Sequence, residues 1–241
     1  MYYVCPQTKW YYDELKQVGV DYEDKKKVAE YDSVMQNLRD VKKELEEIST
    51  SINLKADQVI IEIGAGTGEF AIEVSKYCKK VFALDISRTM LDFANKKAQM
   101  RQQSNIDFIH GGFLTYTHQG ELADAVITQF ALHHLPDFWK MAALKRIHEM
   151  LKDGGRLYLR DVVFPSGVED YARFFNKIIN RLKTDVGANI AEETIIHIKE
   201  EYSTFDWIME NLLTKAGFTI DEANYDNEFL ATYVCTKYKS S

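Results

Sequence analysis

Three glycines alternate with other residues directly after a run of apolar residues in the segment VIIEIGAGTGEF. The apolar run predicts a buried strand. Gly64, Gly66 and Gly68 predict a turn whose backbone amides a ligand can approach closely. A dinucleotide fingerprint needs a third glycine at position 69, which is Glu69 here. A carboxylate at Glu62, beside the turn, suits a ligand that carries an ammonium group better than it suits a pyrophosphate.

Further polar residues end or follow predicted strands, namely Asp85, His133, His134, Arg160 and Asp161. Ligands of open α/β sheets bind beyond the carboxyl ends of the strands, so these side chains are expected near the glycine turn. His133 is the better candidate for a catalytic general base, although either histidine could serve only packing or a local hydrogen bond. Arg160 and Asp161 could orient a substrate, or Asp161 could instead cap the next turn.

An alternating series of strands and helices is needed to position these residues. Strands are predicted at residues 58–63, 80–85, 106–111, 123–130, 156–161, 218–223 and 228–238. Helices are predicted at residues 69–78, 87–100, 136–151 and 204–217. Such alternation indicates an α/β fold in which helices cover both faces of a parallel sheet. The connection before the final strand is short enough to allow only an antiparallel hairpin.

Two segments fall outside this alternation. Apolar residues at helical spacing predict helices over residues 8–19 and 22–49, within an N-terminal helical region of residues 1–53. Residues 54–241 form the main domain, and residues 164–203 interrupt it as an insertion that is expected to form a cap.

With these elements in order, the sequence resembles the class I S-adenosylmethionine-dependent methyltransferases, particularly their small-molecule branch. The resemblance rests on five motifs, EIGAGTGEF, VFALDIS, ADAVITQFALHHLPD, LKDGGRLYLRD and LLTKAGF, which follow one another at the family's spacing. It implies a Rossmann-like, seven-stranded, mainly parallel sheet with an antiparallel last strand, helices on both faces and an N-terminal helical lid. It also implies S-adenosyl-L-methionine as the cofactor and S-adenosyl-L-homocysteine as the product.

The resemblance also assigns residues to the cofactor. The assigned residues are Glu62, Gly64, Ala65, Gly66, Gly68, Asp85, Ile86, Met90, Gly112, Phe113, Gln129 and Tyr31. Asp85 would accept hydrogen bonds from both ribose hydroxyls, which a carboxylate can do with its two oxygens. Family members commonly carry an acid after the third strand that receives the adenine amino group. Here Gly112 stands at that position, so Phe113 or a backbone carbonyl would contact the adenine instead.

The methyl acceptor is expected to bind among aromatic and polar residues, on what we call the acceptor side of the site. The residues assigned to it are Tyr11, Tyr12, His134, Arg160, Asp161 and Phe174. By resemblance, the aromatic N-terminus folds over the cofactor as a lid, and the Tyr31 phenol could hydrogen-bond the cofactor's carboxylate. Most aromatic residues at helical spacing belong simply to a core, and that alternative stays open for each of them.

The expected reaction is direct in-line displacement of the methyl group onto a small molecule, with no metal required, because the sulfonium already makes the methyl electrophilic. Two alternatives remain. One is an RNA methyltransferase, favoured only by the basic residues Lys177, Arg181 and Lys183, and the other is a cofactor-binding regulator without activity. A nicotinamide dehydrogenase is disfavoured by Glu69.

Composition narrows the possible partners. The 241 residues carry a formal net charge of −7, which is the wrong sign for phosphate neutralisation and disfavours nucleic acid. The sequence contains no apolar run long enough for a membrane helix and no secretory signal pattern, so a cytoplasmic location is expected. Three cysteines without metal-ligand spacing predict neither disulfides nor zinc. Either a monomer or a homodimer is compatible with the sequence.

Overall fold

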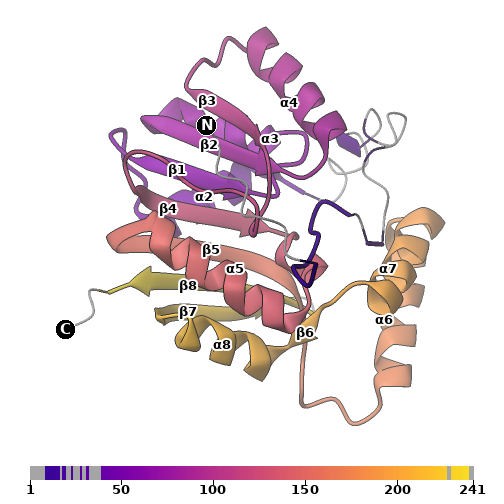
Figure 1. Cartoon of the computed structure of the whole chain (residues 1–241). Coiled ribbons are helices and arrows are strands. Elements are labelled where there is room, and N and C mark those ends of the chain that lie inside the picture. Colours follow the sequence, from indigo (N-terminus) through magenta and orange to yellow (C-terminus); the bar gives the residue numbers. More distant parts are fainter. Residues whose placement is uncertain are drawn as a thin grey trace.

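The computed structural model describes residues 9–16, 18, 19, 23, 28, 31, 32, 39–226 and 229–238. Its centre is one twisted sheet with the strand order β3-β2-β1-β4-β5-β8-β7 (Figure 1). The strands are β1 (Val59–Ile63), β2 (Lys80–Asp85), β3 (Ile106–His110), β4 (Ala123–Gln129), β5 (Leu151–Phe164), β6 (Thr204–Phe205), β7 (Phe218–Asp226) and β8 (Leu230–Lys237). The two-residue strand β6 pairs with the end of β5, off the main path.

The strand directions confirm the predicted mainly parallel sheet. Strands β1 to β5 pair in parallel, whereas β8 pairs antiparallel with both β5 and β7. The last strand therefore inserts between its two neighbours as one arm of a hairpin, as its short connection requires. Because β1 lies inside the sheet, between β2 and β4, the turn that follows it opens at the sheet's carboxyl edge and away from the sheet's sides.

Helices cover both faces of the sheet (Figure 1). They are α2 (Val41–Ile52), α3 (Glu69–Val74), α4 (Arg88–Met100), α5 (Asp137–Met150), α6 (Tyr171–Asp185), α7 (Ala188–Glu200) and α8 (Asp206–Lys215). Helices α5 and α8 bury Leu144 and Leu213 in one hydrophobic core. On the other face, α2 and α3 bury Ile48 and Phe70 against β1, β2 and β4.

Helices α6 and α7 pack against each other and stand beside the carboxyl ends of the strands (Figure 1). They occupy the chain between β5 and β6, within the segment predicted as an insertion. Most of their residues are exposed or half-buried, and Ile178 of α6 and Ala191 of α7 are fully buried. The pair is thus an appendage to the sheet, and its role as a cap stays a prediction.

The predicted continuous helix over residues 22–49 is wrong. Asp40 has extended backbone angles, φ −102° and ψ 92°, and its side chain accepts hydrogen bonds from the amides of Lys42 and Lys43. Asp40 is therefore the N-cap of α2, and an N-cap residue has non-helical backbone angles. A continuous helix cannot run through this position. Much of the earlier part of this prediction lies outside the described residues.

Other predicted boundaries also shift. The helix expected over residues 8–19 is absent from residues 9–16, which form turns and bends. Helix α5 ends at Met150, one residue before its predicted end, because β5 already begins at Leu151. Helix α8 begins at Asp206, since the two residues before it pair as β6. Within the described part of the chain, no helix is both long and apolar enough to cross a membrane.

Candidate functional site

The three glycines of the turn after β1 have left-handed backbone angles but different surroundings. Their φ values are +83° at Gly64, +54° at Gly66 and +74° at Gly68. A Cβ on Gly64 would lie 2.5 Å from the Cβ of Ala131, and one on Gly68 would lie 2.8 Å from the Cβ of Ala94. A Cβ on Gly66 would meet nothing within 4 Å. Gly64 and Gly68 thus permit close packing, whereas Gly66 faces open space that a ligand can fill.

Asp85 closes β2 and is tied to this turn. Its Oδ2 accepts a hydrogen bond of 2.7 Å from the Gly66 amide, and its Oδ1 accepts one of 2.8 Å from the Ser87 amide. Burial raises the pKa of Asp85, and these two amides oppose that rise. Each carboxylate oxygen keeps a lone pair for a further donor. Ser87 itself caps α4 by accepting from the Met90 amide, which leaves Asp85 free of that task.

Glu62 is a buried carboxyl group at the end of β1. Its Oε2 has no hydrogen-bond partner among the residues that the structure describes. Burial raises its pKa to about 8, although the positive charge of Arg39 opposes the rise. Both side-chain polar atoms of Gln129, at the end of β4, likewise lack a described partner. A buried polar atom without a hydrogen-bond partner lowers the stability of the fold. These groups therefore fit a ligand that forms hydrogen bonds with them.

A cavity of about 800 Å³ opens at this edge of the sheet. Of the residues assigned to the cofactor, those lining it are Glu62, Gly64, Ala65, Gly66, Asp85, Ile86, Met90, Gly112, Phe113, Gln129 and Tyr31. Gly68 does not line the cavity, since it packs against α4. Glu69 forms ion pairs with Lys97 and Arg101 at 2.8 and 3.0 Å, and therefore serves the packing of α3 on α4.

Comparison with known proteins agrees with this geometry. A family model described as a methyltransferase domain matches residues 60–155. An uncharacterised methyltransferase of Geobacillus kaustophilus is 27% identical over 181 residues, which cover 75% of this chain and 78% of the relative. The chain therefore carries a methyltransferase domain over residues 60–155. S-adenosyl-L-methionine is the methyl donor that its resemblance to the class I enzymes implies.

Solved structures confirm the fold of this methyltransferase. A SAM-dependent methyltransferase from Aquifex aeolicus superposes with a TM-score of 0.62 at 17% identity, over 89% of this chain and 98% of that one. The N-methyltransferase NodS of Bradyrhizobium japonicum, crystallised with S-adenosyl-L-homocysteine, gives a TM-score of 0.58 at 16% identity, over 82% and 87% of the two chains. At such identities the likeness concerns the fold alone.

The residues present fit the cofactor. The Oε2 atom of Glu62, which has no described partner, offers an acceptor for the cofactor's ammonium group. Asp85 offers two oxygens for the ribose hydroxyls. The open space at Gly66 lets the ligand pass close to the backbone. These assignments of single residues stay predictions.

The methyltransferase carries a second group of polar side chains in the same cavity, around His133. The His133 Nδ1 atom lies 2.5 Å from Asp161 Oδ1, and Nε2 lies 3.2 Å from Glu201 Oε2. Burial alone would lower the pKa of His133, but the two carboxylates raise it to about 9. Burial and the charge of His133 lower the pKa of His134 to about 4. His133 thus lies between two carboxylates. They favour the doubly protonated, positively charged form of its ring at neutral pH.

The remaining residues expected on the acceptor side divide into two sets. His134 and Arg160 line the cavity, and the Nε atom of Arg160 has no described partner. Asp161 does not line it, because this carboxylate is buried beneath His133. Tyr11, Tyr12 and Phe174 also lie outside the lining residues.

Each of these three aromatic residues packs against another ring. Tyr11 and Tyr12 lie against Trp139, with ring centroids 4.8 and 6.1 Å apart. Phe174 packs on Phe175. The structure therefore places them in aromatic packing, which the sequence pattern had left open as an alternative.

Three acidic residues of the N-terminal region, to which the sequence analysis assigned no role, bind the segments that follow β1, β2 and β3. Asp32 accepts a hydrogen bond from Thr67 and pairs with Lys97. Glu23 accepts one of 3.0 Å from the Arg88 amide. Glu14 accepts hydrogen bonds from the amides of Leu114 and Thr115 at 2.8 and 2.6 Å and from the Thr115 hydroxyl at 2.7 Å. We call Glu14, Glu23 and Asp32 the N-terminal anchors.

Glu14 also accounts for the glycine where an acid was expected. A Cβ at Gly112 would lie 2.7 Å from Glu14 Oε2. Gly112 thus makes room for a carboxylate supplied by a distant part of the chain. Glu14 lines the cavity beside Gly112 and Phe113.

His197 and Glu201 were missed as well. They lie four residues apart at the end of α7, a spacing that places two side chains on one helix face. That spacing was the available sequence signal. The spacing alone does not point to the cavity, which the structure shows both residues to line.

Proposed function

We propose that this chain transfers the methyl group of S-adenosyl-L-methionine to a small polar molecule bound in the same cavity. The observation that supports this is the composition of the cavity wall. The wall carries Glu62, Gly66 and Asp85 and also the polar side chains of His134 and Arg160. About 800 Å³ lies towards the upper end of the roughly 300–1,000 Å³ of small-molecule sites, so the space suits a cofactor together with a small acceptor.

The chain's own residues would bind and orient the two reactants. When bound, the cofactor supplies an electrophilic methyl group. Glu62 and Asp85 would fix its ammonium and ribose, and holding the acceptor in line would provide most of the rate. Arg160 stacks over the ring of Phe130, with its Cζ 5.7 Å from the ring centroid, and its orphaned Nε suits an anionic or carbonyl group of the acceptor.

The wall of the cavity favours a small acceptor over RNA. Arg181, one of the three basic residues that raised the RNA alternative, lines the cavity, as do Glu193 and Leu182. Two helices, α6 and α7, contribute to the same wall, which limits the size of an acceptor that can enter. The negative net charge points the same way.

The test is calorimetric titration of the full chain with S-adenosyl-L-homocysteine, followed by methyl-transfer assays on small thiols, hydroxyl compounds and amines, with bulk tRNA in parallel. Asp85→Asn should weaken binding at least tenfold, or about 1.4 kcal/mol. Asp107→Asn is the matched control, because this exposed aspartate lies on the neighbouring strand β3 and, among the described residues, pairs with Lys80.

Equal affinities of the two variants would refute the assignment of Asp85. Saturable, salt-dependent methylation of tRNA without any small acceptor would favour the RNA alternative.

A further inference from the structure

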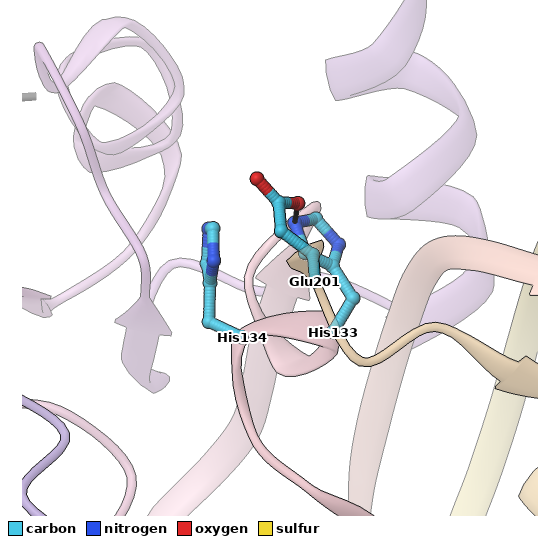
Figure 2. A group of neighbouring side chains, drawn as sticks. All are labelled: His133, His134 and Glu201. Atoms are coloured by element: carbon cyan, nitrogen blue, oxygen red, sulfur yellow. Dashed lines mark ion pairs between the residues drawn. The ribbon is translucent and has the colours of Figure 1, made fainter. Parts of the chain in front are cut away.

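Three side chains in the cavity converge on one point. His133 and His134 lie in the short 3₁₀ turn Leu132–His134 that follows β4, and Glu201 follows the last residue of α7. One ligand atom from each residue lies within 4.8 Å of the others. Figure 2 shows the two imidazoles rising side by side from one turn, with the carboxylate of Glu201 beside them. The cluster joins two segments that are more than sixty residues apart in sequence.

Two imidazoles and one carboxylate form a ligand set that proteins use for zinc and for non-haem iron. In such three-ligand sites, further coordination positions stay open for water or substrate. This cluster lines the same cavity as Gly66 and Asp85, and a ligand entering the cavity can therefore reach it.

The surroundings resemble an outer coordination shell. Asp161 contacts His133 twice, through the Nδ1 atom at 2.5 Å and the backbone amide at 3.0 Å, and so leaves Nε2 directed at the cluster. Histidine ligands of metals are usually oriented by a carboxylate in this way. His197 contacts the Glu201 carboxylate through Nδ1 and holds Ser203 through Nε2 at 2.7 Å.

The turn that carries Glu201 is itself fixed. The Tyr202 amide donates a hydrogen bond of 2.9 Å to the His133 carbonyl. The fully buried Lys140 donates to the Tyr202 carbonyl and pairs with Asp137 at 2.8 Å. Glu201 is therefore held beside the histidines by the backbone on either side of the cluster.

Charge balance also favours a cation. Asp161 and Glu201 have side chains only 1% and 3% exposed, and both face His133. Two buried carboxylates need compensating positive charge. The rings of His133 and His197 contact these carboxylates, and a divalent ion in the cluster would balance both negative charges without requiring either ring to be protonated.

We propose that His133, His134 and Glu201 bind one divalent transition-metal ion, and that its open positions take an oxygen or sulfur atom of the methyl acceptor. The metal site stands without the proposed function, whereas the acceptor's coordination rests on it. A hydroxyl or thiol bound to the ion loses its proton to solvent more readily. The methyl group then moves from the sulfonium to that oxygen or sulfur, leaving S-adenosyl-L-homocysteine and a methylated acceptor. This differs from the metal-free transfer expected from the sequence.

The experiment uses the full chain after treatment with a chelator and dialysis. Zn²⁺ is titrated by calorimetry, and Co²⁺ is added as a spectroscopic probe. We expect one ion per chain and visible cobalt bands of four- or five-coordinate geometry. His134→Gln and Glu201→Gln should each weaken Zn²⁺ binding at least a hundredfold. His118→Gln, a histidine bonded to Tyr116 and to the Glu121 carbonyl, is the matched control and should bind as the unchanged chain does.

Titration of the same samples with S-adenosyl-L-homocysteine separates the two ideas and shows that each variant is folded. If the chain binds S-adenosyl-L-homocysteine but does not bind one Zn²⁺ ion saturably, the metal site is overturned and the proposed function stands. Metal binding unchanged by both substitutions, or lost equally in His118→Gln, would also overturn it. If a variant does not fold, the stoichiometry and cobalt spectrum of the unchanged chain decide.

Discussion

The buried carboxyl group of Glu62 should make the ligand-free protein less stable as the pH rises. Its pKa moves from 4.5 to about 8 on folding, with burial as the largest cause. Because the folded state binds its proton more tightly than the unfolded state, the contribution is full below pH 4.5 and is lost as the pH rises towards 8. One pKa unit corresponds to about 1.4 kcal/mol. The loss between pH 6 and pH 8 is thus about 2–3 kcal/mol.

The perturbation that isolates this contribution is Glu62→Gln, which keeps the shape of the side chain and cannot ionise. Urea unfolding of the ligand-free protein at pH 6, 7 and 8 should show the variant gaining about 2–3 kcal/mol relative to the unchanged chain across this range. Glu46→Gln, an exposed glutamate on α2, is the control and should show no such gain. Parallel pH profiles for the unchanged chain and Glu62→Gln would refute the argument that Glu62 is buried as a neutral acid.

The same residue links stability to binding. If Glu62 must ionise to receive the cofactor's ammonium, affinity for S-adenosyl-L-homocysteine should rise by up to about tenfold per pH unit below pH 8. Glu62→Gln should abolish that rise and bind more weakly. Calorimetry in buffers of different ionisation enthalpy measures the proton released. An affinity independent of pH between 6 and 8 would show that Glu62 does not contact the ammonium group.

Two further predictions concern the glycine turn and the N-terminal anchors. Gly64→Ala should destabilise the fold, because its Cβ would lie 2.5 Å from the Ala131 Cβ at φ +83°. Gly66→Ala should mainly weaken binding of S-adenosyl-L-homocysteine, since its Cβ enters open space; thermal unfolding and calorimetry on both variants check this, and equal effects on stability would contradict it. Glu14→Ala leaves the amides of Leu114 and Thr115 without their acceptor and should lower the free energy of unfolding by about 1–3 kcal/mol, whereas Glu46→Ala should change it little. A Glu14→Ala protein as stable as the unchanged chain would show that water replaces the carboxylate.

The cofactor side of the cavity could be predicted because its residues lie in contiguous strand-turn motifs. A strand that ends at Asp85 and a turn that begins at Gly64 fix their own local geometry, and parallel pairing of β1 with β2 brings them together. The parallel pairing followed from the alternation of strands and helices, and the antiparallel β8 followed from its short connection.

Other residues of the cavity could not be predicted in this way. Glu14, His197 and Glu201 reach the cavity from segments whose position depends on long-range packing, and no local spacing encodes that packing. The break before α2 was missed for another reason. Apolar residues keep their helical spacing on both sides of Asp40, so periodicity concealed a capping residue whose side chain binds two amides.

The N-terminal anchors have a consequence for the rate of turnover. Each binds the segment that follows a different strand, and residues Glu14, Tyr31 and Asp32 form part of the cavity wall. The cofactor must enter and leave this cavity in every cycle. We expect exchange to require at least one of the three carboxylates to release its hydrogen bonds. The speed of the reaction cycle would then depend on how tightly Glu14, Glu23 and Asp32 hold these segments.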